Sequence, residues 1–133
     1  MNGRLLLDTN AVIALFRDDP SAKGKLKDAD EVFLPSIVLG ELLYGALRSG
    51  RKEANAARCR RFAAANTVLS CDAGTAEEYA LIENGLRVRG TPIPDNDVWI
   101  SALALQHGLA VLTRDGHFGS VAALGSGFTA EAW

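Results

Sequence analysis

The sequence has few of the residues that cross-link a chain or anchor it in a membrane. It contains only two cysteines, which excludes a disulfide framework, and neither Cys59 nor Cys71 has a histidine or second cysteine at metal-ligand spacing. No apolar run approaches the roughly 20 residues of a membrane span, and the three leucines before Asp8 are too few for a signal peptide. We therefore expect ordinary thiols, no membrane partner and a cytoplasmic location.

An excess of positive charge is also lacking. The formal net charge of −2 argues against a generally basic coat for nucleic acid. A local exception lies between residues 48 and 61, where basic residues far outnumber acidic ones. On a helix over residues 51–66, Arg51, Arg58 and Arg61 would share one stripe. That stripe is either a solvated face or a patch that contacts phosphate or a partner, with Arg58 and Arg61 as candidate contacts.

What the chain does have is an alternation of short apolar strands with amphipathic helices. With 133 residues, it is long enough for a single domain over residues 1–133. Helices between buried strands predict an α/β fold, a three-layer sandwich with a central, mostly parallel sheet flanked by helices. The strands are expected at residues 4–8, 32–34, 67–69 and 109–113, with a further edge strand at 127–129.

Capping residues predict where the helices begin. Ser36 is a candidate N-cap, Thr75–Glu78 has the form of a capping box, and Asp95 or Asn96 would cap a central apolar helix. Gly108 ends that helix. The helix after Ser36 carries a predicted buried stripe at i, i+3, i+4, i+7 and i+8, made of Leu39, Leu42, Leu43, Ala46 and Leu47.

Four acidic residues stand where such a fold would bring them together. Asp8 and Asp115 each follow an apolar strand, and ligands of open α/β sheets bind outside the carboxyl ends of the strands. Asp97 lies in the first turn of the central helix, and Glu41 lies off the apolar stripe of its own helix. We therefore expect Asp8, Glu41, Asp97 and Asp115 to share one site.

Each acid also has a simpler explanation when it is taken alone. Asp97 suits a helix dipole, Asp115 suits a turn, and Glu41 suits a solvated helix surface. Together, however, they are costly, because two carboxylates ~4 Å apart repel by roughly 4 kcal/mol at an effective dielectric of about 20. A bound divalent cation offsets that repulsion, and oxygen ligands favour Mg²⁺ or Mn²⁺ over zinc.

Four segments that contain these acids resemble, in this order, the PIN-domain ribonucleases, and most closely the VapC-type toxins of bacterial toxin-antitoxin pairs. The segments are Leu7–Asn10, Ser36–Leu42, Asp95–Ala102 and Leu112–Phe118. The resemblance spans nearly the whole chain.

The resemblance implies a metal-dependent endoribonuclease. Asp8, Glu41, Asp97 and Asp115 match the acidic quartet that surrounds one or two Mg²⁺ or Mn²⁺ ions, and Thr9 matches a hydroxyl beside the first acid. Water activated by the metal would hydrolyse an RNA phosphodiester and leave a 5′-phosphate and a 3′-hydroxyl. The implied partners are an RNA substrate, a small cognate antitoxin and a second copy in a homodimer.

The antitoxin is expected on the helices around residues 36–49 and 51–66. There the apolar Leu43, Leu47 and Phe62 lie near the basic stripe, a combination that suits an amphipathic segment.

Two positions depart from the family's pattern. Some relatives carry the fourth acid just before the phenylalanine, where this chain has His117, so that Asp115 takes the role here. A lone histidine in a loop is usually structural or solvated, with proton transfer as the other interpretation. Asp95 competes with Asp97, and we prefer Asp97 because it lies three residues before Ile100 in an Asp-x-x-Ile-x-Ala pattern.

Other functions remain open from the sequence. The chain could be an RNA-processing PIN nuclease without a toxin role, or a PIN-like module that binds without cleaving. A haloacid-dehalogenase-like phosphatase would need a second aspartate where Asn10 stands. The identity of the RNA depends on the surface around the acids, which the sequence does not describe.

Overall fold

Five parallel strands form the centre of the computed structural model, which describes residues 3–133. The first two residues of the predicted domain therefore lie outside it. The sheet has the order β3-β2-β1-β4-β5. The elements are β1 (Arg4–Leu7), α1 (Thr9–Phe16), α2 (Pro20–Asp28), β2 (Glu31–Pro35), α3 (Ser36–Leu47), α4 (Lys52–Ala65), β3 (Thr67–Leu69), α5 (Ala73–Val88), α6 (Asp95–His107), β4 (Ala110–Leu112), α7 (Phe118–Ala122) and β5 (Ala130–Glu131).

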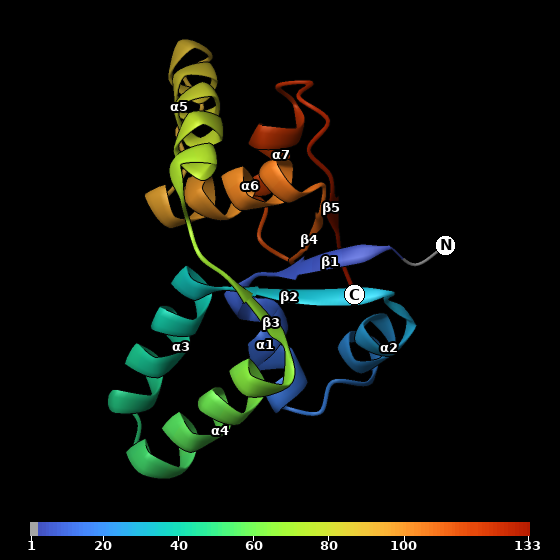
Figure 1. Ribbon diagram of the computed structural model, residues 1–133, viewed down its shortest axis with the longest axis vertical. Helices are drawn as coiled ribbons and strands as arrows, with labels where there is room; N and C mark the ends of the chain where they lie inside the picture. The colour runs from blue at the N-terminus through green and yellow to red at the C-terminus, as the bar shows by residue number, and fades with distance from the viewer. Residues whose placement is uncertain (1–2) are drawn as a thin grey trace.

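Helices cover both faces of this sheet. Figure 1 shows α1 to α4 on one side and α5 to α7 on the other. The three-layer α/β sandwich predicted from the alternation of strands and helices is confirmed, because parallel strands need crossover helices that then bury both faces of the sheet.

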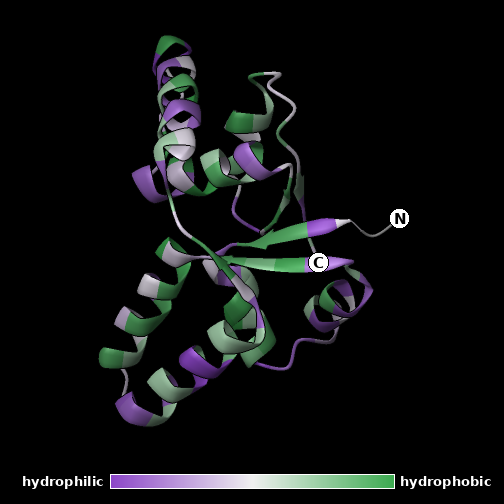
Figure 2. Cartoon of the chain, viewed as in Figure 1, coloured by the Kyte–Doolittle hydropathy of each residue, from purple (hydrophilic) through white to green (hydrophobic). Residues whose placement is uncertain are grey.

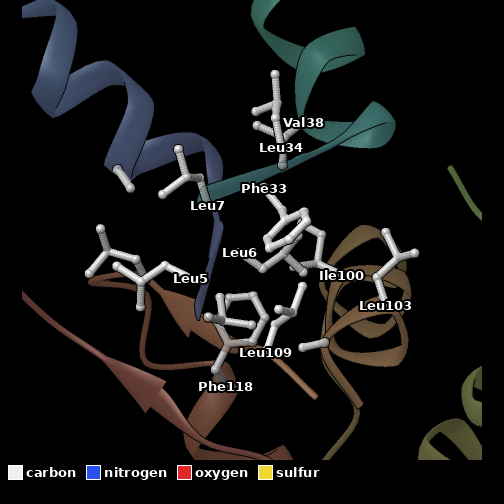
Figure 3. Packing of buried hydrophobic residues seen from close by; sticks show 14 of the residues in the cluster. Leu5, Leu6, Leu7, Phe33, Leu34, Val38, Ile100, Leu103, Leu109 and Phe118 are labelled. Carbon is white, nitrogen blue, oxygen red and sulfur yellow. The ribbon is translucent and has the colours of Figure 1, made fainter. Parts of the chain in front are cut away.

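The central strand β1 is covered by other apolar side chains on both of its faces. Leu6 lies among Phe33 and Ile100 on the side of α6, whereas Leu7 points to the side on which Leu34 and Val38 lie (Figure 3). Successive side chains of a strand point to opposite faces, so a strand covered on both sides must be apolar at every position.

The hydropathy of the strands changes along their length. In Figure 2, β1 and β2 are hydrophilic where they begin and hydrophobic beyond. Arg4 and Glu31 are paired in register at these beginnings and form an ion pair of 3.1 Å. Their side chains are about half exposed, so this pair contributes little stability. The buried ends of β1 and β2 are their carboxyl ends, and ligands of open α/β sheets bind just outside such ends.

The register of β1 and β4 sets the position of the site. Leu7 is paired with Leu112, and the backbone N–H of Asp8 donates to the Leu112 carbonyl oxygen over 3.1 Å. Asp8 and Thr113 therefore leave the sheet side by side at its carboxyl edge.

Three of the predicted helix starts were wrong. Pro35 is the N-cap of α3, because β2 runs on through Pro35 and Ser36 is already helical. Helix α5 begins at Ala73, where Asp72 and Thr75 form the reciprocal capping box, so Thr75 is the third residue of the helix and not its cap.

The central helix also begins earlier than predicted. Pro94 is the N-cap of α6, and both Asp95 and Asn96 lie inside its first turn. Asp97 lies in that turn as predicted. The predicted end is confirmed, since Gly108 has a φ of 65°, a left-handed conformation that glycine adopts without a steric penalty.

One helix and the edge strand were misjudged. The sequence pattern predicted no helix over residues 20–28, yet α2 lies there, with Asp19 as its N-cap and Pro20 in its first turn. This helix is short and polar, so it has little apolar periodicity to detect. The edge strand β5 begins at Ala130 and not at residue 127, although the Thr129 carbonyl already accepts from the Val111 N–H.

The buried face of α3 is rotated from the predicted stripe. Val38, Leu42 and Ala46 are buried, while Leu47 is 61% exposed. The i, i+4, i+8 row is favoured because α3 packs against α4 as well as beside the sheet, where Ala56 and Cys59 of α4 are buried. Leu47 is therefore surface, and the prediction of a buried Leu47 was wrong.

Cys59 and Cys71 are both free thiols. Within residues 3–133, none of the helices combines the length and the apolarity needed to cross a bilayer.

Candidate metal centre

Asp8 is the most firmly held of the acids. It caps α1 and is only 5% exposed. Its Oδ1 accepts from the Thr9 backbone N–H over 2.8 Å, and its Oδ2 accepts from the Thr113 hydroxyl over 2.7 Å. Burial raises the pKa of Asp8 in spite of these two hydrogen bonds. A carboxylate in this position gains from any cation that approaches it.

Asp97 is partly buried, and its side chain is 13% exposed. The pKa of Asp97 is raised to about 6, chiefly by burial and also by the charges of Asp8 and Asp115, although the hydrogen bond with His117 lowers it. The first turn of α6 points this side chain toward the ends of β1 and β4. By contrast, Asp95 accepts a hydrogen bond from the Tyr79 hydroxyl. The geometry thus favours Asp97 over Asp95.

Asp115 and His117 come from the loop between β4 and α7. His117 Nδ1 lies 3.0 Å from Asp97 Oδ2 and 2.9 Å from Asp115 Oδ1. One donor atom from each of these three residues lies within 4.8 Å of the others. Hydrogen bonding to Asp97 raises the pKa of His117. The histidine, for which a structural or solvated role was the usual interpretation, lies in contact with two of the acids.

Glu41 lies at the border of this cluster. It is exposed on α3, and its Oε1 accepts from the Thr9 hydroxyl over 3.1 Å. Thr9 thus links Asp8 to Glu41, because its backbone N–H donates to Asp8 while its hydroxyl donates to Glu41. Glu41 does not belong to the tight group that Asp97, Asp115 and His117 form.

Thr113 and Asn10 have structural roles that sequence reasoning missed. The Thr113 hydroxyl donates to Asp8 and accepts from the backbone N–H of Asp115 over 2.9 Å, and the Asn10 amide reaches the same hydroxyl over 3.4 Å. The signal was present in the sequence, since Thr113 follows the apolar run of β4 as Asp8 follows that of β1. A single hydroxyl therefore links the first and fourth acids.

A groove adjoins the centre on the side of α1, α3 and α4. It has a volume of about 390 Å³, and its lining includes Thr9, Glu41, Ile13 and Arg58. Arg58 donates to the Phe16 carbonyl oxygen over 2.6 Å, and its guanidinium lies 4.4 Å from the centre of the Phe16 ring. Arg61 lines the neighbouring hollow together with Arg58. Neither arginine touches the acids of the centre.

The comparisons with known proteins agree with this geometry. The family model described as PIN domain matches residues 5–124. The chain belongs to the PIN-domain family. It is 31% identical over 114 residues to the tRNA(fMet)-specific endonuclease VapC of Salmonella typhimurium, covering 84% of this chain and 86% of that protein. It is 36% identical over 87 residues to ribonuclease VapC4 of Mycobacterium tuberculosis, covering 64% and 67%.

Solved structures of VapBC complexes contain chains that resemble this chain over nearly its whole length. The DNA-bound VapBC complex from Salmonella typhimurium contains a chain that matches with a TM-score of 0.85 at 28% identity, covering 98% of both chains. VapBC-5 from Mycobacterium tuberculosis, a member of the VapBC family of toxin-antitoxin systems, matches with a TM-score of 0.74 at 27% identity over 97% and 96%. This PIN domain is a nuclease domain of the VapC type.

The donor set of this PIN domain fits a divalent cation. Among the described residues, no Lys or Arg forms an ion pair with Asp8, Asp97 or Asp115, so His117 is the only side-chain cation partner in that set. Buried carboxylates without such partners are destabilising unless a cation joins them. Carboxylate oxygens are the ligands that Mg²⁺ and Mn²⁺ prefer.

Proposed function

We propose that this chain is a Mg²⁺- or Mn²⁺-dependent endoribonuclease that acts in the cytoplasm as the toxin of a toxin-antitoxin pair. The observation that carries the proposal is the cluster of Asp97, Asp115 and His117. Asp8 is joined to Asp115 through the Thr113 hydroxyl, and Glu41 is held beside Asp8 through Thr9. The VapC names of its relatives support ribonuclease activity, and the VapBC complexes support an antitoxin partner.

Asp8 and Asp97 would hold the metal from two sides, and Asp115 would complete the set from the loop after β4. When bound, the metal supplies Lewis-acid activation of water and neutralises charge on the phosphate. The Thr113 hydroxyl and the Thr9 N–H fix the orientation of Asp8, so that little reorganisation is needed during the reaction.

Glu41 is the acid best suited to steer or deprotonate the attacking water. It is exposed, lies next to the buried acids and borders the groove. A general base must reach the proton that it removes, and an exposed carboxylate beside the site has that freedom. In-line attack on an RNA phosphodiester then leaves a 5′-phosphate and a 3′-hydroxyl, without a covalent enzyme intermediate. A single-stranded or looped RNA is the substrate class that presents an unstacked backbone to such an edge.

An amphipathic segment of the antitoxin would occupy the groove between α1, α3 and α4. Exposed apolar surface lies on α3, where Tyr44 and Leu47 are more than half exposed, and Arg58 adds positive charge to the groove. A segment in this groove would cover Glu41 and so close the entrance to the centre. We also propose that the chain forms a homodimer, which would cover the exposed Leu81 and Val88 of α5.

Cleavage of a structured RNA in the presence and absence of metal tests the activity. Cleavage should stop in EDTA and return with Mg²⁺ or Mn²⁺, and the new 5′ ends should carry phosphate. Undiminished cleavage in chelator would refute the metal-dependent mechanism. Mapping of 5′ ends after brief induction in cells would then identify the RNA. Growth arrest that a small protein encoded beside the gene relieves would distinguish a toxin from an RNA-processing enzyme.

A further inference from the structure

His117 places a nitrogen atom among the oxygen donors of the centre. Its Nδ1 lies at nearly equal distances from carboxylate oxygens of two different elements, 3.0 Å from Asp97 on α6 and 2.9 Å from Asp115 in the loop. The ring is held there by its own backbone, because the His117 N–H donates to Asp115 Oδ1 over 2.9 Å. The imidazole is therefore part of the cluster and not a neighbour of it.

The spacing of these atoms matches a coordination sphere. Neighbouring ligands of an octahedral ion with bonds of about 2.1 Å are about 3.0 Å apart. The two contacts of Nδ1 have that length, and one donor atom from each of Asp97, Asp115 and His117 lies within 4.8 Å of the others. All three groups can therefore offer a donor atom to one ion.

Simple hydrogen bonding accounts less well for the arrangement. A nitrogen of an imidazole ring carries at most one proton, so Nδ1 can make one good hydrogen bond to a carboxylate and leaves the second contact without a proton. A cation bound by Nδ1 and by both carboxylates satisfies all three groups together.

We propose that His117 is a nitrogen ligand of the metal centre and that it shifts the selectivity of the centre from Mg²⁺ toward Mn²⁺. This inference rests on the proposed function, since it concerns the same metal. Mg²⁺ binds oxygen and keeps its water ligands, whereas an imidazole nitrogen favours first-row transition ions. Replacement of His117 by an acid would give a set of oxygen donors alone.

Pulsed EPR of bound Mn²⁺ tests the proposal directly, because the nuclear spin of a coordinated nitrogen modulates the signal. The sequence has only two histidines, and His107 lies at the far end of α6, so any imidazole signal can be assigned. We expect directly bound nitrogen in the wild-type protein and in the His107→Ala control. The signal should be absent from His117→Ala and His117→Asp, and thermal unfolding would verify that these variants fold.

Competition between the two ions gives a second readout. The His117→Asp variant should reduce the preference for Mn²⁺ over Mg²⁺ by about tenfold, the scale on which changes around a metal alter its affinity, while His107→Ala should leave the preference unchanged. Asp97→Asn should abolish Mn²⁺ binding and so show that the signal comes from this centre.

The outcomes separate this inference from the proposed function. Tight Mn²⁺ binding without a coordinated nitrogen, or an unchanged preference in His117→Asp, would overturn the role of His117 and leave the metal centre intact. A failure of the wild-type protein to bind Mn²⁺ at all would overturn both.

Discussion

Asp8 and Glu41 are both acids of the proposed metal centre, but their surroundings differ. Asp8 is 5% exposed and accepts two hydrogen bonds from elements of the sheet edge, while Glu41 is exposed on α3 and accepts one from Thr9. Because Asp8 is buried without a Lys or Arg partner, its negative charge destabilises the folded protein in the absence of metal. Because Glu41 remains in contact with water, its charge costs little.

This difference indicates that two sides of the proposed centre have separate functions. The sheet side, made of Asp8, Asp97, Asp115 and His117, is suited to holding a cation in one position. The helix side, made of Glu41 and the groove below it, is suited to meeting water, RNA and a partner. Changes on the sheet side should therefore alter metal binding and stability together, whereas changes on the helix side should alter turnover or partner binding alone.

The largest expected effect is that of Asp97→Asn. Loss of a charged ligand should lower the cleavage rate at least ~100-fold. In EDTA at pH 8, the free energy of unfolding should increase by about 3 kcal/mol, because a carboxylate whose pKa is about 6 no longer has to be ionised in the folded protein. Cleavage assays and denaturant titrations measure the two changes.

Asp95→Asn is the matched control, since Asp95 lies in the same helical turn but binds Tyr79. It should retain nearly full cleavage. A rate for Asp97→Asn close to that of the wild-type protein would refute the assignment of the centre.

Charge reversal on α4 tests whether the groove binds the antitoxin. The double variant Arg58→Glu/Arg61→Glu should weaken antitoxin binding by more than about tenfold, as loss of charge complementarity does at interfaces, and should leave Mn²⁺ affinity unchanged. Arg60→Glu, exposed on the same helix, is the control. Binding titrations with antitoxin and with RNA give the comparison, and a melting curve accounts for the lost contact between Arg58 and Phe16.

A different result would redefine the basic stripe. If RNA affinity falls with a strong salt dependence and antitoxin binding is retained, the basic stripe that contains Arg58 and Arg61 binds RNA. If neither affinity changes, the arginines form a solvated face.

A smaller effect is expected for Glu41→Gln. Turnover should fall by about tenfold, less than the roughly 100-fold or more that a general base contributes, because the metal still activates the water. The dissociation constant for Mn²⁺ should change less than it does in Asp8→Asn. Single-turnover rates at saturating metal, together with metal titrations, separate the two quantities. An equal loss of metal affinity in both variants would remove the distinction between the two sides of the centre.

The smallest expected effect is on the pH dependence of stability without metal. The pKa values of Asp8, Asp97 and His117 are all raised in the folded protein. A raised pKa means that the folded state binds protons more tightly, so the stability from these groups is present in mild acid and is lost as the pH rises. Between pH 5 and pH 8 in EDTA, the melting temperature should fall.

The Asp97→Asn protein should show a flatter profile over the same range. A melting temperature that rises toward pH 8 in the wild-type protein would contradict the raised pKa values. Below about pH 4 the trend should reverse, because Asp18 and Asp72 have lowered pKa values and lose their stabilising contacts when they are protonated.

Much of the fold followed from local pattern. The apolar runs predicted β1, β2 and β4, because a strand buried on both faces must be apolar throughout. The short edge strand β3 was predicted as well, although its residues are only partly buried or exposed. Where pattern was weak, the prediction failed: α2 is polar and short, and Ser36 was displaced as an N-cap because Pro35 still belongs to β2. Helix boundaries depend on which of several polar residues finds a backbone partner, and neighbouring residues compete for that role.

For the proposed centre, the sequence by itself determined that Asp8 and Asp115 lie at the carboxyl edge of the sheet, since a residue that follows a buried parallel strand must emerge at its carboxyl end. Only the tertiary structure decided that Thr113 joins Asp8 to Asp115, that Asp95 is occupied by Tyr79, and that the ring of His117 lies between two carboxylates. These contacts span 16 to 105 residues of sequence, with the exception of those within the loop. Strand register and the path of the loop before α7 create them, and neither can be derived from local sequence pattern.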